Sequence, residues 1–262
     1  MSLGVAVLLG VLQGLTEFLP VSSSGHLALA RLLVPGFSQP GVVFDAMLHV
    51  GTAAAVVWYE RGEIRRWLTT PGGRRLFGLL IAGTIATAVI AFPVKNTAEA
   101  AFVRPVWIGL ALIFTGLVVS LTRWLPGGAK DERGTTWRQA GLIGLAQGLA
   151  VFPGLSRSGM TIATALGAGL DRNWAPRFSF LLGVPAIAGV TVLEVLDERH
   201  ALAAAGAGYW AACFIGAVAA GFAGYFALTI VIKTLSSRVF HRFAWYCVPL
   251  GLVVIALTWS RS

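Results

Sequence analysis

The chain has 262 residues, of which 56% are Ala, Val, Ile, Leu, Met, Phe, Trp, Tyr or Cys and only 12% are charged. Soluble domains carry about 25% charged residues, so this composition excludes a soluble globular enzyme and a disordered chain and indicates a polytopic membrane protein. The net charge is +9, but the basic residues lie between apolar runs rather than in a stripe interleaved with aromatic residues, which excludes a nucleic-acid-binding protein.

Six apolar runs approach the length of about 20 residues that a helix needs to cross the hydrocarbon core of a membrane. In chain order these runs are 42–59, 76–93, 105–123, 177–196, 208–233 and 243–259. Four other runs are too short or too interrupted, and they form two adjacent pairs. The pairs are 3–17 with 23–34, and 138–151 with 157–169.

A stretch that contains proline, glycine and serine breaks each pair, at 19–25 in the first and at 152–159 in the second. Proline stops a helix and glycine permits turns. Non-helical backbone is tolerated at membrane depth only where it is buried in protein or lines a wet cavity. Each pair therefore predicts a re-entrant helix–loop–helix hairpin. Two kinked spans per pair are the alternative, which the short lengths disfavour.

The two breaks are copies of one another. A shift of 134 residues aligns the identical pairs Gln13/Gln147, Gly14/Gly148, Leu15/Leu149, Phe18/Phe152, Ser22/Ser156, Ser24/Ser158 and Gly25/Gly159. Each copy, about 1–126 and about 134–262, holds one hairpin and three spans, so the second copy enters the membrane upside down. The sequence thus predicts one all-α membrane domain, 1–262, with six transmembrane helices, two re-entrant hairpins and an inverted-topology repeat, whose broken helices converge on a site.

The loop charges predict an orientation. If the hairpins do not cross the membrane, most of the 20 Lys and Arg residues fall on one side. The other side receives only Arg31, Lys95, Arg104, Arg199 and Arg261, while Arg157 lies within a break. By the positive-inside rule the richer side is cytoplasmic, and both termini and the entrance of the first hairpin are on the outer face.

Glu17 ends an apolar helix, one turn after Gln13 on the same face. A charged side chain at membrane depth costs about 2.5–3.5 kcal/mol on insertion scales, which marks it as a functional candidate. The repeat places Val151 at the equivalent position, so folding alone does not require the acid. A functional acid is therefore favoured over a helix-end acid that reaches water.

Three consecutive serines and a histidine follow this acid: Ser22, Ser23, Ser24 and His26. The N-terminus of the helix that begins there offers free N–H groups and a positive dipole to an anion. N-capping explains one of these serines, but it does not explain three of them together with a histidine.

Arg157 stands where the first copy has Ser23, with Ser156 and Ser158 on either side. A guanidinium in a loop of positive dipole is unfavourable unless an anion is present, and arginine binds phosphate bidentately. An internal ion pair with Glu17 is the alternative. The combined set favours phosphoryl chemistry over recognition of a carboxylate.

Gln13, Asp45 and His49 are the supporting candidates. Asp45 and His49 lie one helical turn apart near the start of a span, where they fit either residues that support the site or a helix-end ion pair.

Two segments resemble the signatures of the undecaprenyl-diphosphatase family, also called the bacitracin-resistance family. Residues 13–26, QGLTEFLPVSSSGH, are similar to its (E/Q)GxTEFLPVSS(S/T)GH motif, and residues 152–159, FPGLSRSG, look like its second motif. Phe44-Asp45 and the run from Leu48 to Thr52 match the stretch between the two. The resemblance covers essentially the whole chain.

The resemblance implies an integral hydrolase of the bacterial inner membrane that removes the terminal phosphate of undecaprenyl diphosphate. The product is the lipid carrier for cell-wall synthesis, and the activity confers bacitracin resistance. The implied catalytic residues are Glu17, Ser23, His26 and Arg157. The implied phosphate-binding residues are Ser22, Ser24, Gly25, Ser156, Arg157 and Ser158.

In the mechanism predicted from these residues, Arg157 and the hairpin N–H groups hold the diphosphate. Ser23 attacks the terminal phosphorus or positions a water, while His26 and Glu17 handle the protons. A variant has His26 as the direct nucleophile. The family is associated with a divalent cation, Mg²⁺ or Ca²⁺. Because position 13 is Gln where many members carry Glu, Glu17 is the one possible anionic ligand of the motif, which gives little support for a tightly bound ion.

A transporter or flippase of an anionic polyprenyl phosphate lipid is the alternative function, because an inverted repeat is a transporter plan. The type 2 phosphatidic-acid-phosphatase family also uses SGH and SR, but it requires a histidine where this chain has Ala163. The expected partners are a polyprenyl diphosphate substrate and membrane lipids. The oligomeric state is left open, with a homodimer as one option.

Overall fold

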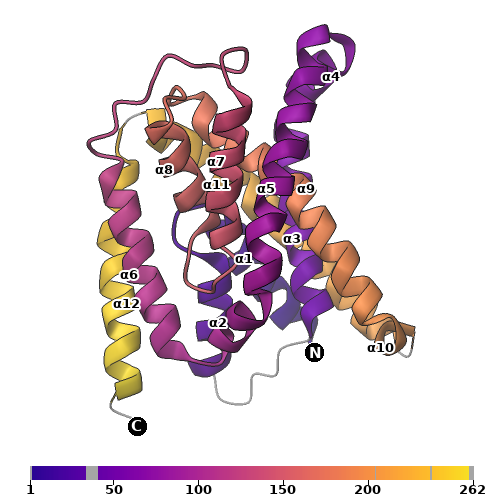
Figure 1. The fold of residues 1–262 in the computed structure, drawn as a ribbon. Coiled ribbons are helices and arrows are strands. Elements are labelled where there is room, and N and C mark those ends of the chain that lie inside the picture. The colour runs from indigo at the N-terminus through magenta and orange to yellow at the C-terminus, as the bar shows by residue number, and fades with distance from the viewer. Residues whose placement is uncertain (1, 34–40, 204, 237, 260–262) are drawn as a thin grey trace.

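The computed structural model describes residues 2–33, 41–203, 205–236 and 238–259 (Figure 1). These residues form helices, with one isolated bridge between Lys130 and Leu170 and no longer strand among them, so the all-α class predicted from the sequence is confirmed. The helices are α1 (Leu3–Phe18), α2 (Ser23–Leu33), α3 (Val42–Tyr59), α4 (Arg61–Thr69), α5 (Pro71–Phe102), α6 (Pro105–Leu121), α7 (Trp137–Leu149), α8 (Arg157–Gly167), α9 (Trp174–Asp197), α10 (Arg199–Ala203), α11 (Ala207–Ser236), the 3₁₀ helix η1 (Phe240–Phe243) and α12 (Ala244–Trp259).

Five segments are long and apolar enough to cross a membrane: α3, α5, α9, α11 and the stretch Phe240–Thr258 that contains η1 and α12. The sixth predicted span, α6, is a shorter apolar helix of 17 residues. Large apolar side chains point outward from these helices, as in Phe222, which is 79% exposed, and Trp245, which is 81% exposed. Such a surface suits lipid rather than water, and the chain is a multi-pass membrane protein.

The end of the second predicted span is wrong, because α5 runs on from residue 93 to Phe102 with Pro93 inside it. Apolar character ends near Pro93, but the residues that follow include the helix formers Ala, Glu and Lys. Lys95 and Glu99 form an ion pair of 3.8 Å at a spacing of four residues, which supports this polar extension. The short helices α4 and α10 were also not predicted.

The helices of the two predicted halves interlock. The principal helix pairs are α1 with α11, α6 with α12, α3 with α11, α5 with α7 and α3 with α9. Glycines permit the close approach: a Cβ on Gly14 would lie 2.5 Å from the carbonyl oxygen of Ala220, and one on Gly148 would lie 2.7 Å from that of Thr87. Small residues at such crossings let helix backbones pack closely inside a membrane.

The breaks come where they were predicted, between α1 and α2 and between α7 and α8. Helix α2 lies toward the lower end of the view and α8 toward the upper end, so the breaks lie between the two ends (Figure 1).

Residue 34, which was predicted to end the second short helix, and Arg261 lie outside the described residues.

Basic residues fasten the end of the molecule that carries α4. Arg177 makes a two-pronged ion pair with the buried carboxylate of Glu60, and Arg75 and Arg172 donate to backbone carbonyls of the loop 122–136. Arg75 and Arg172 therefore hold the loop 122–136 in place. This structural role comes in addition to the charge bias between the two sides that the sequence indicated.

Candidate active site

One serine in each break caps the helix that follows. Ser22 Oγ accepts a hydrogen bond of 3.2 Å from Gly25 N, and Ser156 Oγ accepts one of 3.1 Å from Gly159 N. These are equivalent positions in the sequence repeat. Capping was predicted to explain one serine of the first break, and that serine is Ser22; Ser156 has the same role in the second break.

The two breaks touch each other. Gly154 N donates to Ser22 Oγ over 3.1 Å, and Ser158 Oγ donates to the carbonyl of Leu19 over 3.0 Å. A Cβ on Gly25 would lie 3.1 Å from Gly154 Cα, so the loops pass backbone to backbone. Ser22 holds a left-handed conformation with φ of 67°, which is costly for a residue with a side chain and is maintained by these contacts.

Most of the serines predicted to bind phosphate are occupied by these structural bonds. The hydroxyls of Ser22, Ser156 and Ser158 are buried and serve as caps or cross-links. Ser24 is only half-buried, with its hydroxyl 3.4 Å from that of Ser22. Among these four, Ser24 is the hydroxyl best placed to meet a ligand.

The Glu17 carboxylate contacts polar residues from both breaks. Its carboxylate is 3% exposed, and Oε1 forms an ion pair of 2.5 Å with Arg157 Nη2. Oε2 accepts hydrogen bonds from Ser23 Oγ at 2.7 Å and from Gln13 Nε2 at 2.8 Å. The ion pair considered as an alternative from the sequence is therefore present, and it joins the first break to the second.

His49 joins the same cluster from α3. Its Nδ1 lies 2.9 Å from Gln13 Nε2 and 3.3 Å from Glu17 Oε2, so it accepts from the Gln13 amide when unprotonated and donates to the Glu17 carboxylate when protonated. The His49 side chain is 32% exposed, which makes it the open side of the cluster. Asp45 lies one turn earlier on α3 and is half-buried. His49 thus belongs to the polar cluster around Glu17.

His26 lies apart from this cluster in its hydrogen bonds. Its Nδ1 is 2.7 Å from the carbonyl oxygen of Ser22, and its Nε2 is 2.7 Å from the hydroxyl of Tyr246 on α12. The two rings are nearly parallel, with 7° between their planes. Among the described residues, the structure gives His26 no hydrogen bond to Glu17, Ser23 or Arg157. His26 is connected to the Glu17 cluster through the backbone of the first break.

The sequence analysis missed Tyr246, Thr115 and Gly183. Thr115, on α6, bonds both the carbonyl of Gly154 and the amide of Ser156, and so fixes the second break. A Cβ on Gly183 would collide with Arg157 Nη1. A hydroxyl inside an apolar span was the available signal for Thr115, because such a group needs a partner at membrane depth.

Two polar atoms of the cluster are buried without a hydrogen-bond partner among the described residues. They are Gln13 Oε1 and Arg157 Nη1. Buried polar groups are nearly always paired, so the cluster offers an acceptor and a cationic donor beyond those that its own contacts use. This polar surplus is typical of a site rather than of a packing contact.

The donor set fits a tightly held Mg²⁺ or Ca²⁺ poorly. The described residues contain no group of three His, Cys, Asp or Glu side chains suited to a metal ion. Both oxygens of Glu17 already accept hydrogen bonds, and the guanidinium of Arg157 lies against one of them. These ions take six or more oxygen ligands, few of which are available here.

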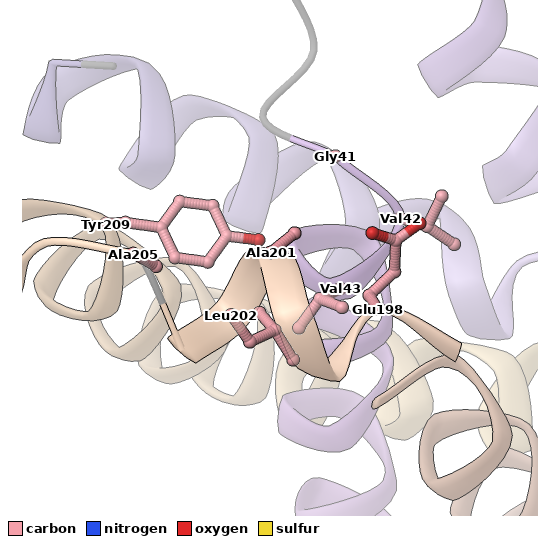
Figure 2. A pocket seen from close by; sticks show the side chains of 8 residues that line it. All are labelled: Gly41, Val42, Val43, Glu198, Ala201, Leu202, Ala205 and Tyr209. Atoms are coloured by element: carbon pink, nitrogen blue, oxygen red, sulfur yellow. The ribbon is translucent and has the colours of Figure 1, made fainter. Parts of the chain in front are cut away.

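Two cavities lie outside this cluster. One, of about 360 Å³, lies between the start of α3, α10 and the start of α11, and Figure 2 shows Tyr209 and Glu198 among its lining residues. The other, of about 590 Å³, is largely apolar and is bounded by α5, α6 and the second break, with Phe152, Pro153 and Leu155 among its lining residues. Neither is lined by a predicted catalytic residue.

Taken together, the fold and the site define a polytopic membrane protein with a buried cluster of arginine, glutamate, serine and histidine where two helix breaks meet. The family model described as bacitracin resistance protein BacA matches residues 6–253. The chain belongs to this family, which confirms the resemblance found from the two motifs.

Curated relatives align with this chain over nearly their full lengths. The chain is 41% identical to an undecaprenyl-diphosphatase of Carboxydothermus hydrogenoformans over 255 residues, which cover 96% of each chain. It is 40% identical to one of Desulforapulum autotrophicum, covering 97% of this chain and 98% of the relative. It is 37% identical to undecaprenyl-diphosphatase 4 of Bacillus thuringiensis, covering 98% and 97% respectively.

Proposed function

We propose that this chain is an undecaprenyl-diphosphatase, a membrane hydrolase that removes the terminal phosphate of undecaprenyl diphosphate. The family match and the names of the relatives support this activity. The same activity accounts for lipid-carrier recycling in cell-wall synthesis and for bacitracin resistance. The observation that carries the proposal is the buried Glu17 carboxylate, which holds Ser23 and Arg157 together where the two helix breaks meet.

Ser23 is the nucleophile that this geometry favours. Its hydroxyl donates to Glu17 Oε2, so the carboxylate is placed to take the proton as Oγ attacks the terminal phosphorus. The anhydride P–O bond then breaks, and undecaprenyl phosphate leaves with the electron pair. Water attacks the phosphoserine, Ser23 regains its proton from Glu17, and inorganic phosphate departs.

Arg157 supplies the positive charge that the phosphoryl oxygens need. A guanidinium has five N–H donors, and the ion pair with Glu17 uses Nη2. Arg157 can therefore bind a phosphate without releasing the carboxylate. The N-terminus of α8, where Arg157 is the first helical residue, adds a dipole of the same sign.

His26 enters this scheme through its Nε2 atom, as the base for the attacking water or as the direct nucleophile. Direct attack by water positioned on Ser23 is the remaining route. The named relatives are diphosphatases, so they add no support to the transporter alternative.

The architecture that we propose keeps the two hairpins re-entrant and the two halves, about 1–126 and about 134–262, as an inverted repeat. The contacts of α1 with α11 and of α7 with α5 support this proposal, because the repeat exchanges one pair for the other. The matching caps of the two breaks support it as well. In this arrangement a polyprenyl tail stays in lipid while its diphosphate reaches the breaks.

The site is tested by phosphate release from undecaprenyl diphosphate in detergent, where no compartments exist and transport cannot be scored. Glu17→Gln keeps the size of the side chain but removes the base, so we expect kcat to fall by at least about 100-fold, the scale of general base catalysis. Glu99→Gln is the matched control, because Glu99 is exposed on α5 away from the cluster. A Glu17→Gln protein with normal turnover would remove Glu17 from the mechanism.

A further inference from the structure

Tyr246 lies on α12, far along the chain from the first break, yet it contacts the predicted catalytic histidine. Its hydroxyl is 2.7 Å from His26 Nε2, and its ring is parallel to the imidazole with 5.7 Å between the ring centroids. The neighbouring residue makes a second contact with the same break, because Cys247 Sγ donates to the carbonyl of Pro20 over 3.2 Å. Helix α12 is therefore fastened to the first break by two consecutive residues.

The register of α12 is set independently by its packing on α6. A Cβ on Gly116 of α6 would lie 2.6 Å from a methyl group of Val248, and one on Gly109 would lie 2.8 Å from the carbonyl oxygen of Gly251. The helices thus approach closely along the part of α12 that follows Tyr246. The packing of α12 on α6 therefore fixes the position of the Tyr246 backbone relative to His26.

The hydrogen bonds of His26 define which ring nitrogen carries the proton. A backbone carbonyl only accepts, so the Nδ1 atom that faces Ser22 must carry a hydrogen. In the neutral ring Nε2 is then the acceptor, and the Tyr246 hydroxyl donates to it. When Nε2 takes a proton, the same hydroxyl oxygen can accept from it, because a phenol is both donor and acceptor.

We propose that Tyr246 is the positioning residue for His26 in phosphoryl transfer. The Ser22 carbonyl keeps the proton on Nδ1, while the Tyr246 hydroxyl holds the imidazole plane and stabilises both protonation states of Nε2. The side chain is 47% exposed, so the hydroxyl sits at the open edge of the break rather than in the packed core. This assignment rests on the proposed function, since it requires His26 to act in the reaction.

Tyr246→Phe removes the hydroxyl and keeps the ring, and it is compared with Tyr225→Phe, a tyrosine of similar exposure on α11 whose ring neighbour is Tyr59. We expect Tyr246→Phe to lower kcat about tenfold, the scale of one hydrogen bond, with KM within about twofold. Tyr225→Phe keeps wild-type values. In a His26→Ala background Tyr246→Phe should cause no further loss, because the residue acts through His26.

A structural role alone would give a different pattern. Losses that multiply in the double variant, or a Tyr246→Phe protein with wild-type kcat, would overturn the assignment. A second measurement does not depend on turnover: the imidazole nitrogen NMR signals of His26, identified by their absence in His26→Ala. They should show a single Nδ1–H tautomer in the wild type. In Tyr246→Phe the Nε2 signal should shift because that atom loses its hydrogen bond, and unchanged signals would also overturn the assignment. Wild-type protein that releases no phosphate would instead count against the proposed function.

Discussion

At the residue scale, the two oxygens of Glu17 have different partners. Oε1 pairs with Arg157, whereas Oε2 accepts from Ser23 and Gln13. A buried carboxylate with one cation and two neutral donors is stabilised in its charged form, as a proton acceptor for Ser23 requires. The division of partners also keeps the serine and the guanidinium on separate oxygens, so each can act on the phosphate.

The position of Arg157 depends on a glycine in another helix. Gly183→Ala places a Cβ on Arg157 Nη1, so the guanidinium must move away from Glu17. We expect a loss of activity of about tenfold or more with the fold retained, because a shift of about 1 Å at a catalytic group can cost up to 100-fold. The measurement is kcat/KM for phosphate release.

Gly189→Ala on the same helix serves as the control, since nothing lies within 4 Å of a Cβ there. Both substitutions raise helix propensity equally. Equal activity of the two variants would show that Gly183 does not position Arg157.

Much of the candidate site could be predicted from the sequence, because its members are chemically out of place in a membrane. Glu17 and Arg157 are charges at membrane depth, and the serines stand at a helix start. Tyr246 and Gly183 could not be found in this way. Their importance comes from contacts across distant parts of the chain, and a tyrosine or a glycine in an apolar span is not unusual by itself.

At the element scale, the helices of the hairpins are held by close backbone approach rather than by large side chains. Helix α1 meets α11 through Gly10 and Gly14, and α7 meets α5 through Gly144 and Gly148. Dispersion at such short separations replaces the hydrophobic effect, which provides little driving force between helices already in lipid. The breaks are therefore positioned by tightly packed supports.

This packing predicts the direction in which a substitution at Gly14 changes the melting temperature. Gly14→Ala brings a Cβ to 2.5 Å from the Ala220 carbonyl oxygen, so α1 must move from α11. We expect a lower melting temperature in detergent, measured by intrinsic fluorescence. Gly4→Ala on the same helix meets nothing within 4 Å and should leave the melting temperature unchanged or raise it, since alanine favours helix by about 1 kcal/mol. A Gly14→Ala protein whose melting temperature is unchanged or raised would contradict the packing argument.

The element boundaries show where sequence reasoning stops. The apolar runs identified the spans because hydropathy measures the match to lipid. The extension of α5 past Pro93 and the short helix α4 are polar, so hydropathy missed them, although their residues favour helix. Which helices pack together was also beyond the sequence, because the glycine contacts that select partners join opposite halves of the chain.

At the scale of the whole molecule, the basic residues predict that the loop 122–136 faces the cytoplasm. The two native cysteines, Cys213 and Cys247, are buried, so an introduced cysteine can be labelled selectively with a thiol reagent. We expect Arg199→Cys to react with a membrane-impermeant maleimide on intact cells, and Lys130→Cys to react only after the cells are opened. The reverse pattern would invert the proposed orientation.

The interlocking of the two halves has a consequence for how the protein is made. The ribosome delivers α1 and its acid first, whereas Arg157 emerges much later and α11, the packing partner of α1, later still. A partly synthesised chain therefore carries a carboxylate in the bilayer with no counter-charge and a glycine face with no neighbour.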